Sequence, residues 1–379
     1  MIPAAHAVLD LSAPRHNLGE VRRYAPASKV MAVIKANGYG HGLLRIAKAL
    51  RGVDGFAVAR VNEGLRLREA GIRERIAVLE GFISQEELEL VRRHRLEPVV
   101  HSLYQVEMIE AASGIASLVV WLKLDTGMNR LGLTEEQFFR ALRRLEQCPI
   151  VRTPIPLMTH LARADEIDSA ETERQLEVFQ RVTEGLKGER SIANSAGILG
   201  WPRTRSDWVR PGILLFGVSP FPHRNGSDHH LRAVMTLQSR LIAIKNIEAG
   251  DAVGYGGCWV APAATRLGVV AIGYGDGYPR AVANGTPVLV GASRVPIAGR
   301  VSMDMLTVDL SRCPTASIGA PVILWGEGLA VEEVAECAGT IPYTLLCAVT
   351  QRVRIIEAYS DTRGVVDSGT PDRPRETAK

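Results

Sequence analysis

The chain has 379 residues, of which 46% are hydrophobic, and it carries a formal net charge of +4. This length predicts two or three domains, or one large barrel with a smaller partner, and the apolar content is ample for packed cores. Charges of both signs are interspersed along the chain without a long Lys/Arg run, so we expect no nucleic-acid partner.

The cysteines and the apolar runs exclude further classes of protein. There are five cysteines, an odd number, and no two of them have CxxC spacing, so we expect neither a metal site nor a disulfide framework. Free thiols suit a reducing cytosol. Residues 1–11 lack a cationic stretch followed by a long apolar one, and no apolar run approaches membrane-spanning length. We therefore predict a soluble, cytoplasmic protein without a membrane partner.

Short apolar runs alternate with helical patterns in the first two-thirds of the chain. The runs are rich in Val, Ile and Leu and show little alternation, as expected of strands that are buried on both faces. Eight such strands with helices between them predict an α/β barrel, although the pattern alone leaves a doubly wound sheet open. The predicted strands are 30–35, 55–60, 76–81, 97–102, 119–125, 154–160, 191–194 and 210–217, and the helical patterns include 42–50, 61–70, 85–95, 134–147 and 168–187.

The character of the sequence changes after about residue 220. Segment 221–230 is polar and rich in turn residues, and the apolar runs between 232 and 358 are short, rich in Val, Ile and Thr, and separated by Gly and Pro. These features predict a mostly β domain. Residues 359–379 are polar with little periodicity and predict a disordered tail. The predicted strands of the β domain include 239–247, 267–273, 286–291, 295–298 and 305–310.

Lys35 is the first candidate for chemistry because it ends the first predicted barrel strand. The active-site face of an α/β barrel is formed by the C-terminal ends of its strands. A lysine there is neutralised when it forms a Schiff base with an aldehyde cofactor, and the glycines that follow at 38, 40 and 42 allow the backbone to turn around a ligand. On this residue alone, an ordinary lysine extending from a strand end is an equal alternative.

The string around Lys35 carries a resemblance that extends over most of the chain. VIKANGYGHG closely resembles the cofactor-lysine motif of alanine racemases, a family with a barrel and a β domain. Further strings resemble motifs of the same family, occur in the family order and span residues 5 to about 358. They are KLDTGMNRLG (123–132), MTHLARADE (158–166), ANSA (193–196), RPGILLFG (210–217), GYGG (254–257), IGYGDGYPR (272–280), GRVSMD (299–304) and IPYTLLC (341–347).

The resemblance implies an architecture, a reaction and a cofactor. Residues 10–225 would form an eight-stranded α/β barrel that binds pyridoxal 5'-phosphate, and residues 1–9 with 226–358 would form the mostly β domain. The implied reaction is the interconversion of L-alanine and D-alanine. It would supply D-alanine for peptidoglycan or feed alanine catabolism, and the sequence leaves both roles open.

Two catalytic bases follow from the resemblance. Lys35 would bind the cofactor covalently and act as one base, and Tyr255 would act as the other. Racemisation needs two bases because a proton must leave one face of the substrate carbon and return on the opposite face. A tyrosine is a poor base unless neighbouring positive or donor groups lower its pKa, and His160 and Arg210 are the family candidates for that environment.

Three basic residues have implied roles around the cofactor ring. Arg210 would face the pyridine nitrogen, and since an arginine cannot accept a proton, we expect the ring nitrogen to stay unprotonated and transamination to be suppressed. Arg130 would lie near the phenolic oxygen and the substrate carboxylate, which its planar fork suits. Lys123 would be carbamylated and orient that arginine, or it would pair unmodified with a carboxylate.

The remaining implied residues hold the phosphate, the substrate and the entrance. Hydroxyl groups and backbone amides suit a phosphate dianion, and Ser195 has a helix N-cap as its alternative role. Met303 would bind the substrate carboxylate through its backbone amide. The phosphate ligands would be Tyr39, Ser195, Gly212, Ile213 and Tyr343, and the narrow substrate entrance would be lined by Tyr274, Arg280 and Arg300.

In the family, the residue corresponding to Tyr255 reaches the active site of the other subunit, so the resemblance implies a homodimer with shared sites. Alternatives remain at this point. They are another pyridoxal-phosphate enzyme on the same architecture, such as a basic-amino-acid decarboxylase or a broader racemase, a non-catalytic cofactor carrier on a similar barrel, and a barrel enzyme whose Lys35 binds a sugar. The carrier is disfavoured because it lacks the β domain, and the sugar enzyme leaves the motifs around Arg210 and Tyr343 unexplained.

Overall fold

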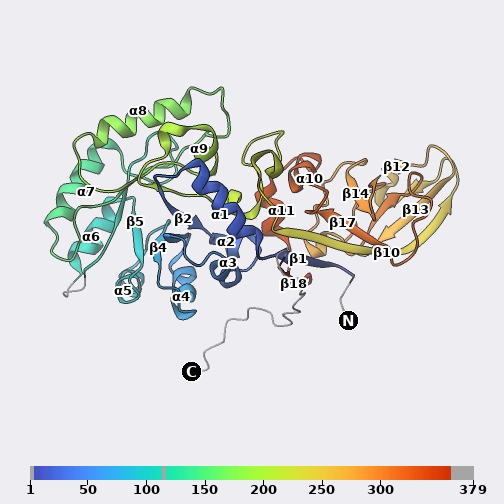
Figure 1. Cartoon of the computed structure of the whole chain (residues 1–379), viewed down its shortest axis with the longest axis horizontal. Helices are drawn as coiled ribbons and strands as arrows, with labels where there is room; N and C mark the ends of the chain where they lie inside the picture. Colours follow the sequence, from blue (N-terminus) through green and yellow to red (C-terminus); the bar gives the residue numbers. More distant parts are fainter. Residues whose placement is uncertain (1–3, 113–116, 360–379) are drawn as a thin grey trace.

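The computed structural model of the chain describes residues 4–112 and 117–359, and it consists of a barrel and a β domain joined side by side (Figure 1). The barrel is closed and parallel, since β2 pairs with β9 through Lys29 opposite Trp208. This closure confirms the predicted α/β barrel and excludes the doubly wound sheet. Its strands are β2 (Lys29–Val33), β3 (Gly55–Val58), β4 (Arg75–Val78), β5 (Glu97–Val100), β6 (Trp121–Lys123), β7 (Leu157–Met158), β8 (Arg190–Ser191) and β9 (Trp208–Val209).

Helices surround the barrel, and several begin at a capping residue that the sequence provides. The hydroxyl oxygens of Ser84, Ser102 and Thr134 each accept a hydrogen bond from the backbone amide three residues later, which satisfies one free donor of the first turn. The helices of the barrel are α1 (Ala13–Tyr24), α3 (Leu43–Ala49), α4 (Val61–Glu69), α5 (Gln85–Arg93), α6 (Leu103–Ala111), α7 (Glu135–Gln147), α8 (Glu171–Thr183) and α9 (Ser195–Gly200).

The N-terminal end of the barrel is closed by a network of charged side chains. Arg75 donates from two nitrogens to the Glu97 carboxylate at 2.7 and 2.9 Å and from a third to Glu189 at 2.8 Å. Lys29 also donates to Glu189, at 2.7 Å, and the indole nitrogen of Trp121 donates to Glu97 at 2.9 Å. Because strands begin at or next to these residues, the network lies at the end of the barrel opposite the strand C-termini.

The predicted last barrel strand, 210–217, is wrong. The strand is β9, and Ile213–Phe216 forms a 3₁₀ helix, η2. Pro211 has no amide hydrogen, and the amide of Gly212 donates to the Ser195 hydroxyl, so two successive residues give no hydrogen bond to a ladder. A short apolar run that is buried on all sides does not distinguish a strand from a helix by its pattern.

The β domain is an eight-stranded sheet built from both ends of the described chain. β1 (His6–Asp10) pairs antiparallel with β10 (Met235–Ile247) and parallel with β18 (Arg354–Ala358). The other strands of this sheet are β13 (Thr265–Val270), β14 (Pro287–Val290), β15 (Ser293–Pro296), β16 (Leu306–Asp309) and β17 (Pro321–Trp325); β11 (Ala252–Val253) pairs with β12 (Trp259–Val260), and the helices α10 (Val331–Cys337) and α11 (Pro342–Ala348) follow β17.

The mostly β character predicted for this part of the chain is confirmed, although β17, β18 and both helices were not assigned from the sequence. The predicted tail lies outside the described residues from residue 360 onward. Within the ranges 4–112 and 117–359, no helix has the length and apolar character needed to cross a membrane.

Candidate active site

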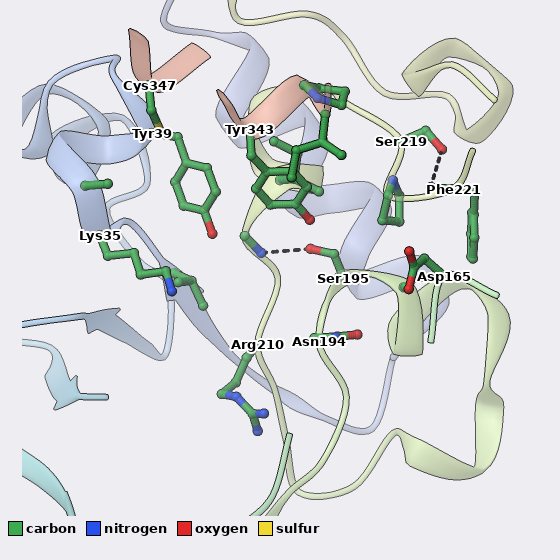
Figure 2. A pocket seen from close by; sticks show the side chains of 18 of the residues that line it. Lys35, Tyr39, Asp165, Asn194, Ser195, Arg210, Ser219, Phe221, Tyr343 and Cys347 are labelled. Atoms are coloured by element: carbon green, nitrogen blue, oxygen red, sulfur yellow. Dashed lines mark hydrogen bonds between the residues drawn. The ribbon is translucent and has the colours of Figure 1, made fainter. Parts of the chain in front are cut away.

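A cavity of about 1160 Å³ opens at the C-terminal end of the barrel strands and extends toward α10 and α11. Figure 2 shows side chains from the barrel and from α11 reaching one shared space, with the Tyr39 and Tyr343 rings side by side. The structure therefore brings most of the sequence-predicted cofactor residues together. Those that line the cavity are Lys35, Tyr39, Lys123, Arg130, His160, Ser195, Arg210, Gly212, Ile213 and Tyr343.

Lys35 is held in the cavity by an unusual turn, residues 35–40, which we call the Lys35 turn. Ala36, Asn37, Gly38 and Tyr39 all have φ between +51° and +63°, so the backbone makes a left-handed helical turn directly after β2. This conformation costs L-residues other than glycine about 1–2 kcal/mol each. The turn persists only because its surroundings fix it, which is typical of functional sites.

The side chain of His41 stabilises the Lys35 turn through hydrogen bonds to two of its backbone carbonyls. Its Nδ1 lies 2.8 Å from the Tyr39 carbonyl oxygen and 3.1 Å from that of Gly38, so Nδ1 carries the proton and donates it. Nε2 is buried without a hydrogen-bond partner among the described residues. Burial, opposed by the two backbone hydrogen bonds, lowers the pKa of His41 to about 4. The imidazole is therefore a neutral donor with a fixed tautomer.

Burial and like charges weaken the protonation of both lysines of the cavity. Burial lowers the pKa of Lys35, and the positive charge of Arg130 lowers it further. Lys123 is 7% exposed, and burial followed by the charges of Arg210 and Arg130 lowers its pKa to about 8. A lowered pKa increases the fraction of neutral amine, and the neutral amine is the form that attacks a carbonyl carbon.

Arg210 is buried at the base of the cavity with its donors directed at neutral acceptors. It donates to the Ser191 hydroxyl and the Thr159 carbonyl at 2.6 Å, and to Nδ1 of His160 at 3.2 Å. Because Nδ1 accepts, the proton of the neutral His160 ring is on Nε2. Burial, followed by the charge of Arg210, lowers the pKa of His160 well below its usual range, whereas burial lowers the pKa of Arg210 only to about 10.

The corner of the cavity between β8, β9 and α11 contains hydroxyls and a backbone amide, with the Asp165 carboxylate nearby. Burial, followed by the negative charge of Asp165, raises the pKa of Tyr343. The Gly212 amide donates to Ser195 Oγ at 3.0 Å, as the dashed line in Figure 2 shows. A Cβ at Gly212 would lie 2.4 Å from the Tyr39 hydroxyl, so this close approach requires glycine. The alternative role of Ser195 as a helix cap is wrong, because Asn194 caps α9 by accepting from the Gly197 amide.

The predicted second base and the entrance residues lie elsewhere. Tyr255 is 69% exposed and Met303 is 53% exposed on loops of the β domain, and neither lines the cavity of its own chain. Tyr274, Arg280 and Arg300 are also exposed and also lie outside this cavity.

The structure adds cavity residues to which sequence reasoning gave no role. Asp165, Asn194 and Cys347 on α11 line the cavity (Figure 2). Glu332 on α10 also lines it. Asp165 and Asn194 lie inside motifs that were recognised for neighbouring residues, so their position in those strings was the available clue. Glu332 had none, because its helix was not predicted.

A closed barrel, a half-buried lysine just after its first strand and a β domain attached beside the cavity define a two-domain barrel protein with a pocket lined by several cations. The family models for the alanine racemase N-terminal and C-terminal domains match residues 9–220 and 234–357. The chain belongs to the alanine racemase family.

Individual relatives are similar to this chain over almost its whole length. It is 50% identical to an alanine racemase of Aeromonas hydrophila over 92% of this chain and 98% of the relative, and 52% identical to one of Shewanella woodyi over 94% and 99%. Among solved structures, it is similar to the biosynthetic alanine racemase of Pseudomonas aeruginosa, with a TM-score of 0.92, 44% identity and coverage of 95% and 100%. The alanine racemase of Acinetobacter baumannii has a TM-score of 0.90, 37% identity and coverage of 94% and 100%.

Proposed function

We propose that this protein interconverts L-alanine and D-alanine with pyridoxal 5'-phosphate as cofactor. The observation that carries the proposal is the position of Lys35, which stands in the barrel cavity beside Arg130, lacks a carboxylate within ion-pair distance in the described part of the chain, and has a lowered pKa. Family membership supports alanine as the substrate. When bound, the cofactor supplies an aldehyde that joins the amino group and a ring that withdraws electrons from the Cα–H bond.

The cavity fits the phosphate end of that cofactor. The corner formed by Tyr39, Ser195, Gly212, Ile213 and Tyr343 offers hydroxyl and amide donors, and glycine at 212 keeps the space in front of the Tyr39 hydroxyl open. Burial raises the pKa of both tyrosines, so both stay protonated and can donate. Neutral donors of this kind suit a phosphate dianion.

The pyridine nitrogen would face Arg210. This guanidinium keeps its protons, since its pKa stays near 10, and so it donates rather than accepts at that position. His160 accepts from the same guanidinium and stays neutral, which prevents it from supplying a proton through Nδ1. This arrangement favours return of the proton to the substrate carbon over transamination.

The substrate carboxylate would bind Arg130 and the Met303 amide. Lys123 is proposed to be carbamylated, because its pKa of about 8 leaves neutral amine available to carbon dioxide and the resulting anion would pair with the cationic Arg130. The alternative is an unmodified, partly neutral lysine. Mass spectrometry of the intact protein with and without bicarbonate distinguishes the two states by the mass of one carbon dioxide.

The two faces of the substrate carbon would be served by Lys35 and by Tyr255 of a second copy of the chain. The exposure of Tyr255 and Met303, and their distance from the cavity lining of their own chain, support a homodimer in which each β domain completes the other barrel. In this assembly residues 10–225 bind the cofactor, and the strand before residue 10 together with residues 226–358 supplies the second base. Tyr274, Arg280 and Arg300 would then line the entrance.

Chiral analysis of L-alanine incubated with the purified protein and pyridoxal phosphate tests the reaction. We expect D-alanine to accumulate until the enantiomers are equal, since they have equal free energy in water, and we expect Lys35→Ala and Tyr255→Phe to lose most of the rate. A yellow protein that bleaches with borohydride but converts no alanine would contradict the substrate assignment. A colourless protein that cannot be reconstituted would contradict the cofactor.

Mixing the two inactive variants tests the shared sites. A heterodimer of Lys35→Ala and Tyr255→Phe has one site with both wild-type bases and one site with neither. Random exchange of subunits is therefore expected to restore about a quarter of wild-type activity. If both bases came from the same chain, no mixture would recover activity.

A further inference from the structure

We propose that Glu63 is a positioning residue that sets where Lys35 stands in the cavity, by holding the amide of Ala36 in the Lys35 turn. The proposal rests on the proposed function of Lys35. Glu63 lies on α4 and is absent from the residues that line the cavity, so its action passes through the backbone.

One carboxylate connects the ends of two neighbouring barrel strands. Glu63 Oε1 accepts from the Ala36 amide at 2.8 Å, immediately after Lys35. Oε2 accepts from the Ala59 amide at 2.9 Å and from the Arg60 amide at 3.2 Å, immediately after β3. Each oxygen therefore has a separate task, and the charge makes these hydrogen bonds stronger than bonds between neutral groups.

The Lys35 turn needs such an anchor because its conformation is intrinsically unfavourable. Ala36 and Asn37 have φ of +53° and +54°, which L-residues avoid. Without an acceptor, the Ala36 amide loses its hydrogen bond, and the backbone is free to relax toward right-handed angles. Such a relaxation moves the Lys35 Cα, and displacements of about 1 Å in a reacting group lower rates strongly.

The negative charge of Glu63 also acts on Lys35 directly. It is among the groups that raise the pKa of Lys35, against the larger effects of burial and of Arg130. A neutral side chain at position 63 therefore alters the lysine electrostatically as well as removing an anchor.

The chain contains a matched control for the capping role of Glu63. Glu87 occupies the same third position of its helix, α5, and its carboxylate accepts from the Ile83 amide at 2.9 Å in the loop between β4 and α5. It does not contact the Lys35 turn and does not line the cavity. Replacing Glu87 removes a helix-terminal hydrogen bond of the same kind but leaves Ala36 untouched.

The test compares Glu63→Ala, Glu63→Gln and Glu87→Ala in the full-length chain. Hydrogen exchange of the peptide covering residues 34–42 is measured in the protein without cofactor, and pyridoxal phosphate affinity and kcat are measured in the reconstituted protein. We expect Glu63→Ala to speed exchange of this peptide and to weaken cofactor binding about tenfold, the scale of one lost charge-assisted hydrogen bond. Glu63→Gln, which keeps one accepting oxygen, is expected to fall between Glu63→Ala and wild type.

The control separates positioning from stability. We expect Glu87→Ala to lower the melting temperature without changing exchange at 34–42 or cofactor affinity. Equal effects of Glu63→Ala and Glu87→Ala on hydrogen exchange, cofactor affinity and kcat would overturn the proposal. If Glu63→Ala does not fold, an unchanged exchange rate of peptide 34–42 in Glu63→Gln would overturn it instead. If wild type binds no pyridoxal phosphate, the proposed function fails, and the exchange measurement still decides whether Glu63 holds the turn.

Discussion

The two ends of the barrel use the same basic residue types in opposite ways. At the N-terminal end, Lys29 and Arg75 each contact a carboxylate within 2.8 Å, and Glu97 and Glu189 receive all of these bonds. Although burial opposes it, hydrogen bonding from Lys29 and Arg75 lowers the pKa of Glu189 to about 2. This end is complete within a single chain and serves the stability of the fold.

At the C-terminal end, four of the cations that line the cavity have no such partners in the described part of the chain. Among the described residues, Lys35, Lys123, Arg130 and Arg210 have no carboxylate within 4 Å of their charged nitrogens. Like charges held close together in a buried site are unfavourable until an anion joins them. The comparison teaches that cations without a carboxylate partner, rather than cations as such, distinguish this cavity from the structural ion network, even though carboxylates such as Glu80 and Asp165 also line it.

The largest expected effect separates two lysines at opposite ends of β2. Lys35→Ala is expected to lower the racemisation rate by about 10⁴-fold, because it removes the covalent attachment and one base. Lys29→Ala is expected to cost at most about 1 kcal/mol of stability and to leave kcat unchanged, since its ion pair is half exposed. Steady-state rates and urea unfolding of both variants measure the difference. Equal losses of activity would remove the distinction between the two ends.

The N-terminal network is expected to show the reverse behaviour. Glu97→Ala should lower the free energy of unfolding by about 3 kcal/mol, because it leaves Arg75 and the Trp121 indole without a shared acceptor in a buried position. Activity per folded molecule should be retained. Glu89→Ala, which removes an exposed partner of Arg92, serves as the control and should change stability by less than about 0.5 kcal/mol.

Stabilisation by the cofactor tests whether the two ends of the barrel act independently. Pyridoxal phosphate at 100 times its dissociation constant is expected to stabilise the protein by about 2.7 kcal/mol. The Glu97→Ala variant should gain the same amount, because the ligand relieves the cations at the other end of the barrel. Thermal unfolding with and without the cofactor measures both gains. A smaller gain in the variant would indicate that the two ends are coupled.

The smallest expected effect, about 2 kcal/mol at pH 5, is a difference in acid sensitivity. His41 has a folded pKa of about 4 and an ordinary value of 6.5, so the unfolded chain binds a proton that the folded chain refuses. The contribution of neutral His41 to the free energy of unfolding is complete above pH 6.5, and it falls by about 1.4 kcal/mol per pH unit as the pH drops toward 4. The lowered pKa of Glu189 places loss of its contribution below its ordinary value of 4.5, toward pH 2. Hydrogen exchange at pH 5 should therefore increase in the Lys35 turn before it increases in β4 and β5, and the opposite order would contradict this assignment.

The sequence predicts the parts of this molecule that depend on local burial and on recognisable strings. The barrel strands appear as apolar runs because both faces of each strand are buried, and Lys35 stands out because it follows the first of these runs. The 3₁₀ helix within 210–217 was not predictable from the apolar pattern, because the hydrogen bond from Gly212 to Ser195 is a tertiary contact.

Other features depend on pairings that are remote in the chain. The left-handed conformation of Ala36 is not predicted by its residue type, in contrast to that of Asn37, and it depends on partners such as Glu63 on another element. Similarly, the carboxylate partners of Arg75 lie 22 and 114 residues away, so their pairing is visible only once the strands are assembled. The resemblance located the site residues in the chain, but not which of them share a cavity.

The position of β1 also has a consequence for the order of events during synthesis. This strand is held on one side by β10 and on the other by β18, so residues 11–353 must be made before both neighbours exist. At about 5–20 residues per second, that interval is on the order of tens of seconds. The barrel has all of its own strands well before then, whereas the eight-stranded sheet of the β domain acquires its last hydrogen bonds only when β18 has left the ribosome. All strands of the barrel are therefore made before the β domain that carries Tyr255 can be completed.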